Sequence, residues 1–410
     1  MKNLFTPVLV VLLVTACGAS RPVDSLFPDT GFQDLGEGNT EFAFELFGRL
    51  CRDAGEDNVM FSPFCISSAL GMAWAGARGE TEAGMAHALG FGDSQSAVHN
   101  GFSRLFGLIE REGIDPGEDP ITLNIANALW VDGNYPLLDD YVTLVSEYYR
   151  AEARNMDFAG DPDAQRVVIN DWVEDMTMQR ITDLLGPGSV TTATRVVLTS
   201  AVYFQGNWRL QFNPELTRDG TFTTLAGEEV TVPFMSRTMD VPFYRGNGFR
   251  AVAMQYSDLQ SRMIILFPDG DFEGFQNDLD PEMLEEVVGG LSVREVAVVM
   301  PPFEFTTDYS LAPALSDMGM GDAFDGSRAD FSGFTGERDL FITAVVHKAF
   351  VKVDETGTEA AAATGVIMAT TAMPSDPPEL FLLDRPFVFL IIDDCSGAVL
   401  FMGRVTDPSL

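Results

Sequence analysis

One segment near the C-terminus constrains the fold of this chain more than any other. From Glu355 to Met373 the sequence contains no proline, and after Glu359 it contains no charged residue. Strand-like runs flank it at 344–354 and 387–392. Its four consecutive alanines favour a helix, whereas the threonines, valine and isoleucine that follow favour a strand. A segment that suits both an exposed loop and a buried strand is a candidate for a change of conformation.

Helical patterns crowd the first half of the chain, and strand patterns crowd the second half. The nearly continuous apolar run from Arg195 to Phe204 predicts a strand that is buried on both faces. No internal repeat or low-complexity linker divides the 410 residues, so the pattern indicates a single α+β domain. Helices are predicted at 39–52, 66–77, 96–111, 138–149 and 170–185.

The N-terminus predicts export. Lys2, a short apolar run and small residues at the cleavage point form the pattern of a secretory signal, which is too short to span a bilayer permanently. Cys17 resembles the cysteine of a bacterial lipobox, which implies lipidation of its thiol; an ordinary signal peptide with a chance cysteine is the alternative. We therefore predict a signal peptide at 1–16, a tether at 17–36 and one domain at 37–410.

The cellular location of the protein is predicted from the same N-terminal segment. An exported chain would be extracellular, on the cell surface or periplasmic, and lipidation at Cys17 would anchor it to a membrane. Glycine rather than aspartate follows Cys17, and the resemblance to a lipobox then implies the outer membrane. Which side of that membrane carries the protein is left open.

The charge of the chain excludes several classes of partner. The sequence has 25 Lys and Arg residues against 61 Asp and Glu residues, a formal net charge of −36. Such a surface repels phosphate backbones, so we expect no binding to nucleic acid or to a heparin-like polyanion. We interpret the charge as a source of solubility.

The sequence contains no convincing catalytic or metal-binding constellation. Motifs such as GxSxG, the P-loop and HExxH are absent, and the histidines His87, His99 and His347 stand apart. We therefore predict no enzymatic activity, no cofactor and no metal. The remaining cysteines lack CxxC or metal-like spacing and are interpreted as buried small residues, with one unassigned disulfide left open. They are Cys51, Cys65 and Cys395.

A set of short motifs, found in order along the chain, identifies a family. The motifs include Asn58-Val-Met-Phe-Ser-Pro63, Gly76-Ala-Arg-Gly-Glu-Thr81, Asn124-Ile-Ala-Asn-Ala-Leu-Trp130, Tyr203-Phe-Gln-Gly-Asn-Trp208, His347-Lys-Ala-Phe350, Gly357-Thr-Glu-Ala-Ala361, Arg385-Pro-Phe387 and Phe401-Met-Gly403. With these motifs the chain resembles a serpin of the bacterial, lipoprotein-like, inhibitory type over about 39–408. The resemblance implies a monomer with an α+β fold of three β-sheets, about eight or nine helices and an exposed reactive-centre loop.

The resemblance also implies a mechanism. A target protease cleaves the loop as a suicide substrate, and the loop's N-terminal half then inserts into the main sheet and traps the acylated protease. The residues permit this, because a central strand excludes proline and alternation from Thr358 sends small side chains inward first. The predicted hinge comprises Glu355, Gly357, Thr358, Glu359, Ala360, Ala361, Ala362, Ala363 and Thr364.

The usual spacing of the family, sixteen residues on from Glu355, places the reactive bond at Thr371-Ala372, with Ala372-Met373 as the next choice. Counting back from Phe381 and Pro386 instead places it nearer Ser375, so the exact bond is left open. No Lys or Arg lies between Glu355 and Asp384. We therefore expect elastase-like, subtilisin-like or chymotrypsin-like serine proteases as targets, and leave a cysteine protease open. The alternative function is a non-inhibitory serpin that serves as a surface binding or structural protein.

Three positions depart from the family pattern. Serpins usually close the main sheet with a hydrogen-bonded latch of serine, asparagine and histidine. Here Ser62 and His347 are present, but Cys65 replaces a second serine and Ser200 replaces the asparagine, which predicts a weaker or differently wired latch. At the top of the sheet Trp208 is retained. The usual lysine partner of Glu355 is replaced by Pro302.

Overall fold

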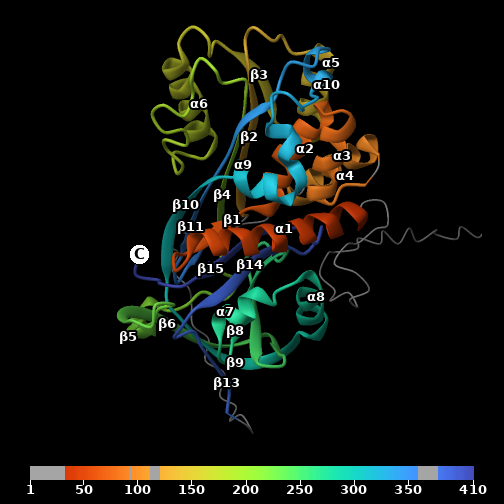
Figure 1. The fold of residues 1–410 in the computed structure, drawn as a ribbon. Coiled ribbons are helices and arrows are strands. Elements are labelled where there is room, and N and C mark those ends of the chain that lie inside the picture. Colours follow the sequence, from red (N-terminus) through yellow and green to blue (C-terminus); the bar gives the residue numbers. More distant parts are fainter. Residues whose placement is uncertain (1–32, 93, 111–120, 359–376) are drawn as a thin grey trace, which may run out of the picture.

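The computed structural model describes residues 33–92, 94–110, 121–358 and 377–410. Figure 1 shows most of the helices against a six-stranded sheet at one end of the molecule and a strand-rich region at the other, with α1 (Gln33–Ala54) running between them. The architecture is α+β, as predicted. Within the described ranges, no helix combines the length and apolar character needed to cross a membrane.

The six-stranded sheet contains the strand that the apolar run predicts. That strand, β4 (Val196–Asn207), is buried from Val196 to Phe204. It lies against α2 (Pro63–Gly76), which is buried at every residue. The strand order is β10 (Phe303–Ser310), β11 (Ile342–Val353), β12 (Gly357–Thr358), β4, β2 (Thr122–Asp132) and β3 (Glu152–Met156).

The second sheet has nine strands and is organised by one long strand, β6 (Glu229–Arg245). Because β6 pairs with β5 and β9 over most of its length and with β7 at its end, it connects two strand-rich regions. The other strands are β1 (Val59–Phe61), β5 (Arg218–Thr223), β7 (Phe249–Gln255), β8 (Ser261–Pro268), β9 (Ser292–Met300), β13 (Glu379–Leu382), β14 (Phe387–Asp393) and β15 (Val399–Val405).

The described part of the chain contains ten α-helices, against the eight or nine that the resemblance implies. The first, α1, begins at Gln33, inside the segment predicted as a tether at 17–36. The remaining helices are α3 (Gly79–Leu89), α4 (Gln95–Ile109), α5 (Asp139–Tyr149), α6 (Pro162–Met176), α7 (Phe272–Asn277), α8 (Pro281–Gly290), α9 (Ala312–Leu315) and α10 (Ser332–Thr335).

The helix predicted at 170–185 was wrong in its bounds. The observed helix, α6, starts at Pro162 because the Asp161 side chain accepts a hydrogen bond from Ala164 N and caps the first turn. It ends at Met176, and Met178 and Gln179 then adopt φ values of 52° and 62°, which a right-handed helix does not accommodate. The apolar residues beyond Met176 are buried by turns rather than by a helix.

The three cysteines after the N-terminal segment remain thiols. Cys51, Cys65 and Cys395 are all buried, as predicted for small core residues. Burial raises the pKa of the Cys51 and Cys65 thiols to about 12, which makes both unreactive at neutral pH.

Candidate functional site: the seam between two central strands

The candidate site is the seam where β4 and β11 meet in the middle of the six-stranded sheet. The two strands pair in parallel from Val196–Ile342 up to Val202–Ala349. Above this point they diverge, and β12 lies between them. Thr358 pairs with Gly206 of β4 and with Val353 of β11. The upper end of the seam therefore already holds the first two residues of an additional strand.

Thr358 points into the core, as the predicted alternation requires. Its side chain is only 1% exposed, and its hydroxyl forms a 2.7 Å hydrogen bond with the hydroxyl of buried Tyr256. Burial raises the pKa of Tyr256 above its ordinary value, so the phenol stays neutral. Gly357 is required at its position because a Cβ would overlap the carbonyl oxygen of Gly206.

Trp208 holds the turn that leads into β12. Its indole Nε1 donates to the carbonyl of Asp354 at 3.0 Å, and its backbone N donates to the carbonyl of Thr356 at 2.8 Å. The indole also stacks on Tyr256, with ring centroids 4.7 Å apart and planes at 14°. Trp208 therefore holds the backbone of the hinge, and Tyr256 holds the side chain of Thr358.

Glu355, whose usual lysine partner is replaced by Pro302, accepts hydrogen bonds from two other residues. Its carboxylate accepts a hydrogen bond from the Thr217 hydroxyl at 2.5 Å, and its carbonyl accepts one from Phe212 N at 2.8 Å. Sequence reasoning missed Thr217, which lies 138 residues away in the chain. No local pattern connects two loop residues at that separation.

The latch at the middle of the seam joins both strands to α2. His347 of β11 lies opposite Ser200 of β4, and its Nδ1 is 3.1 Å from the serine hydroxyl. Its Nε2 accepts a hydrogen bond from Ser62 N at 3.1 Å. Because Nε2 is the acceptor, Nδ1 carries the proton and donates to Ser200. Burial lowers the pKa of His347 to about 3, so the imidazole is neutral.

An asparagine does take part in this latch, but from the neighbouring strand. Asn127 of β2 lies opposite Ser200, and its amide donates to the Cys65 carbonyl at 2.9 Å and to the Ser68 hydroxyl at 2.8 Å. Cys65 thus contributes backbone groups, its N–H donating to the Ser62 hydroxyl at 3.2 Å. Sequence reasoning missed Asn127 and Ser68, although Asn127 belongs to the motif at 124–130.

Asn127 also carries an unsatisfied group. Its side-chain oxygen is buried, and no hydrogen-bond partner for it exists among the residues that the structure describes. Such a group costs about 1–3 kcal/mol. The group lies beside the latch, where the sheet would have to open.

Several predicted site residues fall outside the described ranges. They are the hinge residues from Glu359 to Thr364, the reactive-bond residues Thr371, Ala372 and Met373, and the lipidation residue Cys17. The described part of the prediction, Glu355, Gly357 and Thr358, lies together with Trp208 at the top of the seam, and Ser62, Cys65, Ser200 and His347 lie together at its middle.

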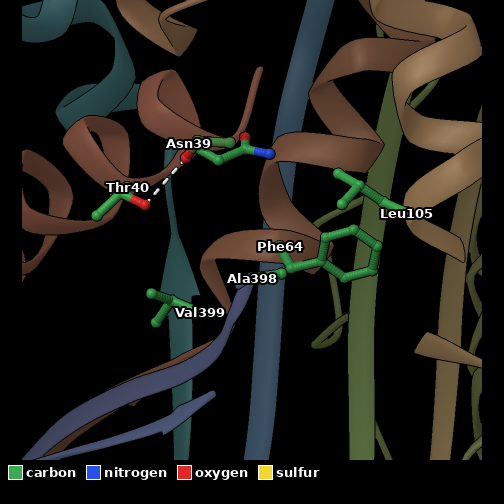
Figure 2. A pocket seen from close by; sticks show the side chains of 7 residues that line it. Asn39, Thr40, Phe64, Leu105, Ala398 and Val399 are labelled. Atoms are coloured by element: carbon green, nitrogen blue, oxygen red, sulfur yellow. Dashed lines mark hydrogen bonds between the residues drawn. The ribbon is translucent and has the colours of Figure 1, made fainter. Parts of the chain in front are cut away.

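Elsewhere among the residues that the structure describes, no feature resembles a catalytic centre. A small pocket beside α1 is lined mainly by Asn39, Thr40, Phe64, Leu105 and Val399, none of which belongs to the seam (Figure 2). Within the described ranges, no group of three or more His, Cys, Asp or Glu side chains could hold a metal ion.

His99 is a packed core residue. It lies 2.7 Å from the Tyr149 hydroxyl, and burial lowers its pKa to about 4.

Comparisons of the sequence with known proteins identify a family. The family model for "Serpin (serine protease inhibitor)" matches residues 37–408. The leukocyte elastase inhibitor of Bos taurus is 37% identical over 386 residues, which cover 92% of this chain and 100% of that protein. An uncharacterized serpin-like protein of Thermococcus kodakarensis is 37% identical over 401 residues, 95% of this chain and 92% of the relative.

Solved structures agree in fold. Serpin48 of the insect Tenebrio molitor superposes with a TM-score of 0.81 at 26% identity, covering 93% of this chain and 100% of that one. Human thyroxine-binding globulin in complex with thyroxine has a TM-score of 0.83 at 26% identity, covering 92% and 99%.

Proposed function

This chain belongs to the serpin family, and from that premise we propose that it inhibits serine proteases as a suicide substrate rather than acting as an enzyme. The observation that supports the proposal most is β12, because the seam between β4 and β11 already holds Gly357 and Thr358 in strand pairing. Cleavage of the loop would release the rest of the strand to follow these two residues into the sheet.

The register of β12 supports this path. Thr358 pairs with Gly206 and Val353 in antiparallel fashion. Continued downward by six residues on each strand, the same register would place Thr364 between Ser200 and His347. The inserting strand would then separate the two latch residues and bring a threonine hydroxyl to replace the hydrogen bond that they share. The sequence thus provides a polar side chain at the one inward position that meets the latch.

The energetics favour completed insertion. A new central strand of about a dozen residues would add roughly a dozen ladder hydrogen bonds of about 1 kcal/mol each, on the order of 10 kcal/mol in total. The inward residues after Thr358 are small or apolar, so no charge enters the core. This difference is large enough to make the conversion effectively irreversible.

The reactive loop suggests the class of target. We place the scissile bond at Thr371-Ala372, with Ala372-Met373 as the next choice, because the usual spacing of the family puts it sixteen residues after Glu355. No basic residue lies between Glu355 and Asp384, which disfavours a trypsin-like enzyme. Elastase-like, subtilisin-like and chymotrypsin-like serine proteases are the proposed partners of a monomeric inhibitor. The name of the bovine relative, leukocyte elastase inhibitor, is in line with the first of these.

Export and anchoring are also part of the proposal. A signal peptide at 1–16 and lipidation of Cys17 would attach the inhibitor to the outer membrane by the segment 17–32 that precedes α1. Attached there, it would meet proteases at the cell surface or in the periplasm.

One experiment tests the inhibitory function. The protein is incubated with pancreatic elastase and with subtilisin, and the products are separated on denaturing gels. We expect a covalent, SDS-resistant complex that is absent when the protease serine has first been blocked. Cleavage of the loop without a complex, across a panel that includes cysteine proteases, would instead support a non-inhibitory binding or structural role.

A further inference from the structure

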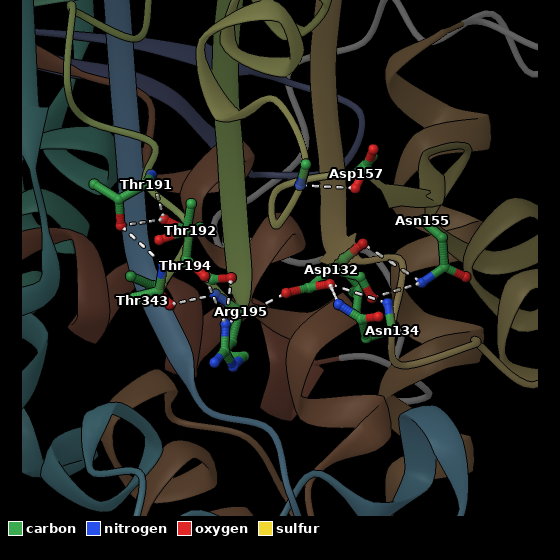
Figure 3. Close-up of polar contacts among 12 residues, drawn as sticks. Asp132, Asn134, Asn155, Asp157, Thr191, Thr192, Thr194, Arg195 and Thr343 are labelled. Carbon is green, nitrogen blue, oxygen red and sulfur yellow. Dashed lines mark hydrogen bonds and ion pairs between the residues drawn. The ribbon is translucent and has the colours of Figure 1, made fainter.

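The lower end of the seam differs from the regular ladder above it. Between Ile342 and Ala344 the pairing of β11 with β4 is irregular, so Thr343 is an extra residue that bulges out of the ladder. The hydroxyl of Thr343 instead accepts a 2.9 Å hydrogen bond from the backbone N of Arg195, just below β4 (Figure 3). We call this bond the lower bridge.

Arg195 is fixed to the β2 side of the seam. Its guanidinium lies 3.3 Å from the buried carboxylate of Asp132 and 5.7 Å from the centre of the Tyr135 ring. Its carbonyl accepts a 2.9 Å hydrogen bond from Asp132 N. Arg195 therefore moves with β4 and β2, whereas Thr343 moves with β11. The lower bridge joins the two halves of the sheet that an inserting strand must separate.

The register of β12 predicts a conflict at this point. Continued ten residues downward from Thr358, it would place Met368 opposite both Val196 and Thr343. In the present structure Val196 faces Ile342 instead. A strand inserted in register therefore requires Thr343 to return to the ladder and the bulge to disappear. The next loop residue, Ala369, would then lie opposite Arg195, whose N–H is now occupied by Thr343.

We propose that the lower bridge belongs only to the uncleaved conformer and that its release controls the last step of insertion. Thr343 is then a positioning residue, because it decides whether the inserted strand reaches the foot of the seam, and hence how far an attached protease is carried. This inference rests on the proposed loop insertion. It differs from the latch at Ser200 and His347, which would be met four residues earlier.

The test is Thr343→Val, which removes the hydroxyl and keeps the β-branched shape on an exposed residue. The matched control is Thr306→Val, at an exposed position of β10 in the same sheet. Thermal unfolding and amide hydrogen exchange of peptides that contain Arg195 are measured before and after loop cleavage by subtilisin. For the uncleaved protein we expect Thr343→Val to lower Tm by about 1–2 °C, to speed exchange at Arg195, and to speed spontaneous conversion to an inserted form about fivefold.

After cleavage, Thr343→Val and wild type should be indistinguishable in Tm and in exchange at Arg195. Equal effects of the variant before and after cleavage, or an uncleaved variant that behaves like Thr306→Val, would overturn the inference. A wild-type protein whose Tm does not rise on cleavage would contradict loop insertion itself. Exchange at Arg195 in the uncleaved protein would still report whether the lower bridge exists, so the two failures are distinguishable.

Discussion

The hydroxyl of Tyr256, just after β7, lies 2.7 Å from the hydroxyl of Thr358, the second residue of β12. The two residues are 102 positions apart in the chain. Through this contact the strand-rich region of the molecule holds the hinge of the proposed reactive loop inside the six-stranded sheet. The contact is polar, buried and made before any cleavage, so it sets the starting point of insertion.

Replacing Tyr256 tests this contact. Tyr256→Phe leaves the Thr358 hydroxyl buried without its partner and should lower the free energy of unfolding by about 1–2 kcal/mol. A double-mutant cycle with Thr358→Val, followed by urea unfolding, isolates the pair. We expect a coupling energy of about 1 kcal/mol; additive effects of the two substitutions would mean that the hydroxyls do not interact in solution.

Thr358→Arg should convert the inhibitor into a substrate. The side chain at this position enters the core, and a guanidinium could be buried there only at a prohibitive cost. When elastase is titrated with this variant, the enzyme should stay active. A denaturing gel of the mixture should show the cleaved variant and no stable complex. Thr358→Ser, which keeps a small hydroxyl, is the control and should still inhibit. Inhibition that survives the arginine would count against insertion at this position.

The latch should make stability depend on pH. Burial depresses the pKa of His347 from 6.5 to about 3, so between these values the unfolded chain binds a proton that the folded chain does not. The contribution of His347 to the free energy of unfolding is therefore complete above pH 6.5. As the pH drops from 6.5 toward 3, the free energy of unfolding falls by up to about 1.4 kcal/mol per pH unit.

Other groups add to the measured slope. His99, with a pKa of about 4, acts in the same direction as His347. Asp394, whose pKa burial raises to about 6, acts in the opposite direction. The comparison is therefore between wild type and His347→Gln, unfolded in urea from pH 4.5 to 7.5. The variant should be less stable at pH 7.5 but lose less stability on acidification; parallel curves would show that His347 is not a buried neutral imidazole.

Cys17→Ser tests the proposed anchor. In a bacterial host, the wild-type chain should incorporate labelled palmitate and fractionate with the outer membrane. The serine variant should lose both properties, because a hydroxyl does not replace the thiol in this modification. Cys51→Ser, at a buried cysteine within the folded domain, is the control and should still be labelled. Labelling that persists in Cys17→Ser would rule out lipidation at this residue.

Much of the fold followed from local patterns. The apolar run at 195–204 predicted a strand buried on both faces, and β4 has that burial. The bounds of α6 could not be predicted in the same way, because residues after Met176 are as apolar as a helix face and only their backbone angles reveal that they turn. The spacing of apolar residues predicts which residues are buried, but it does not tell whether a helix or a series of turns buries them.

The candidate site shows the same division. By itself the sequence determined that the segment after Asp354 could enter a sheet, since it lacks proline, has small side chains and turns Thr358 inward by alternation. Only the tertiary structure decided what those residues meet: Tyr256 at the top, Asn127 beside the latch, Thr217 on Glu355, and the Thr343 bulge at the foot. The physical reason is that alternation is a property of a few neighbouring residues, whereas register and hydrogen-bond partners depend on strands that are distant in the chain.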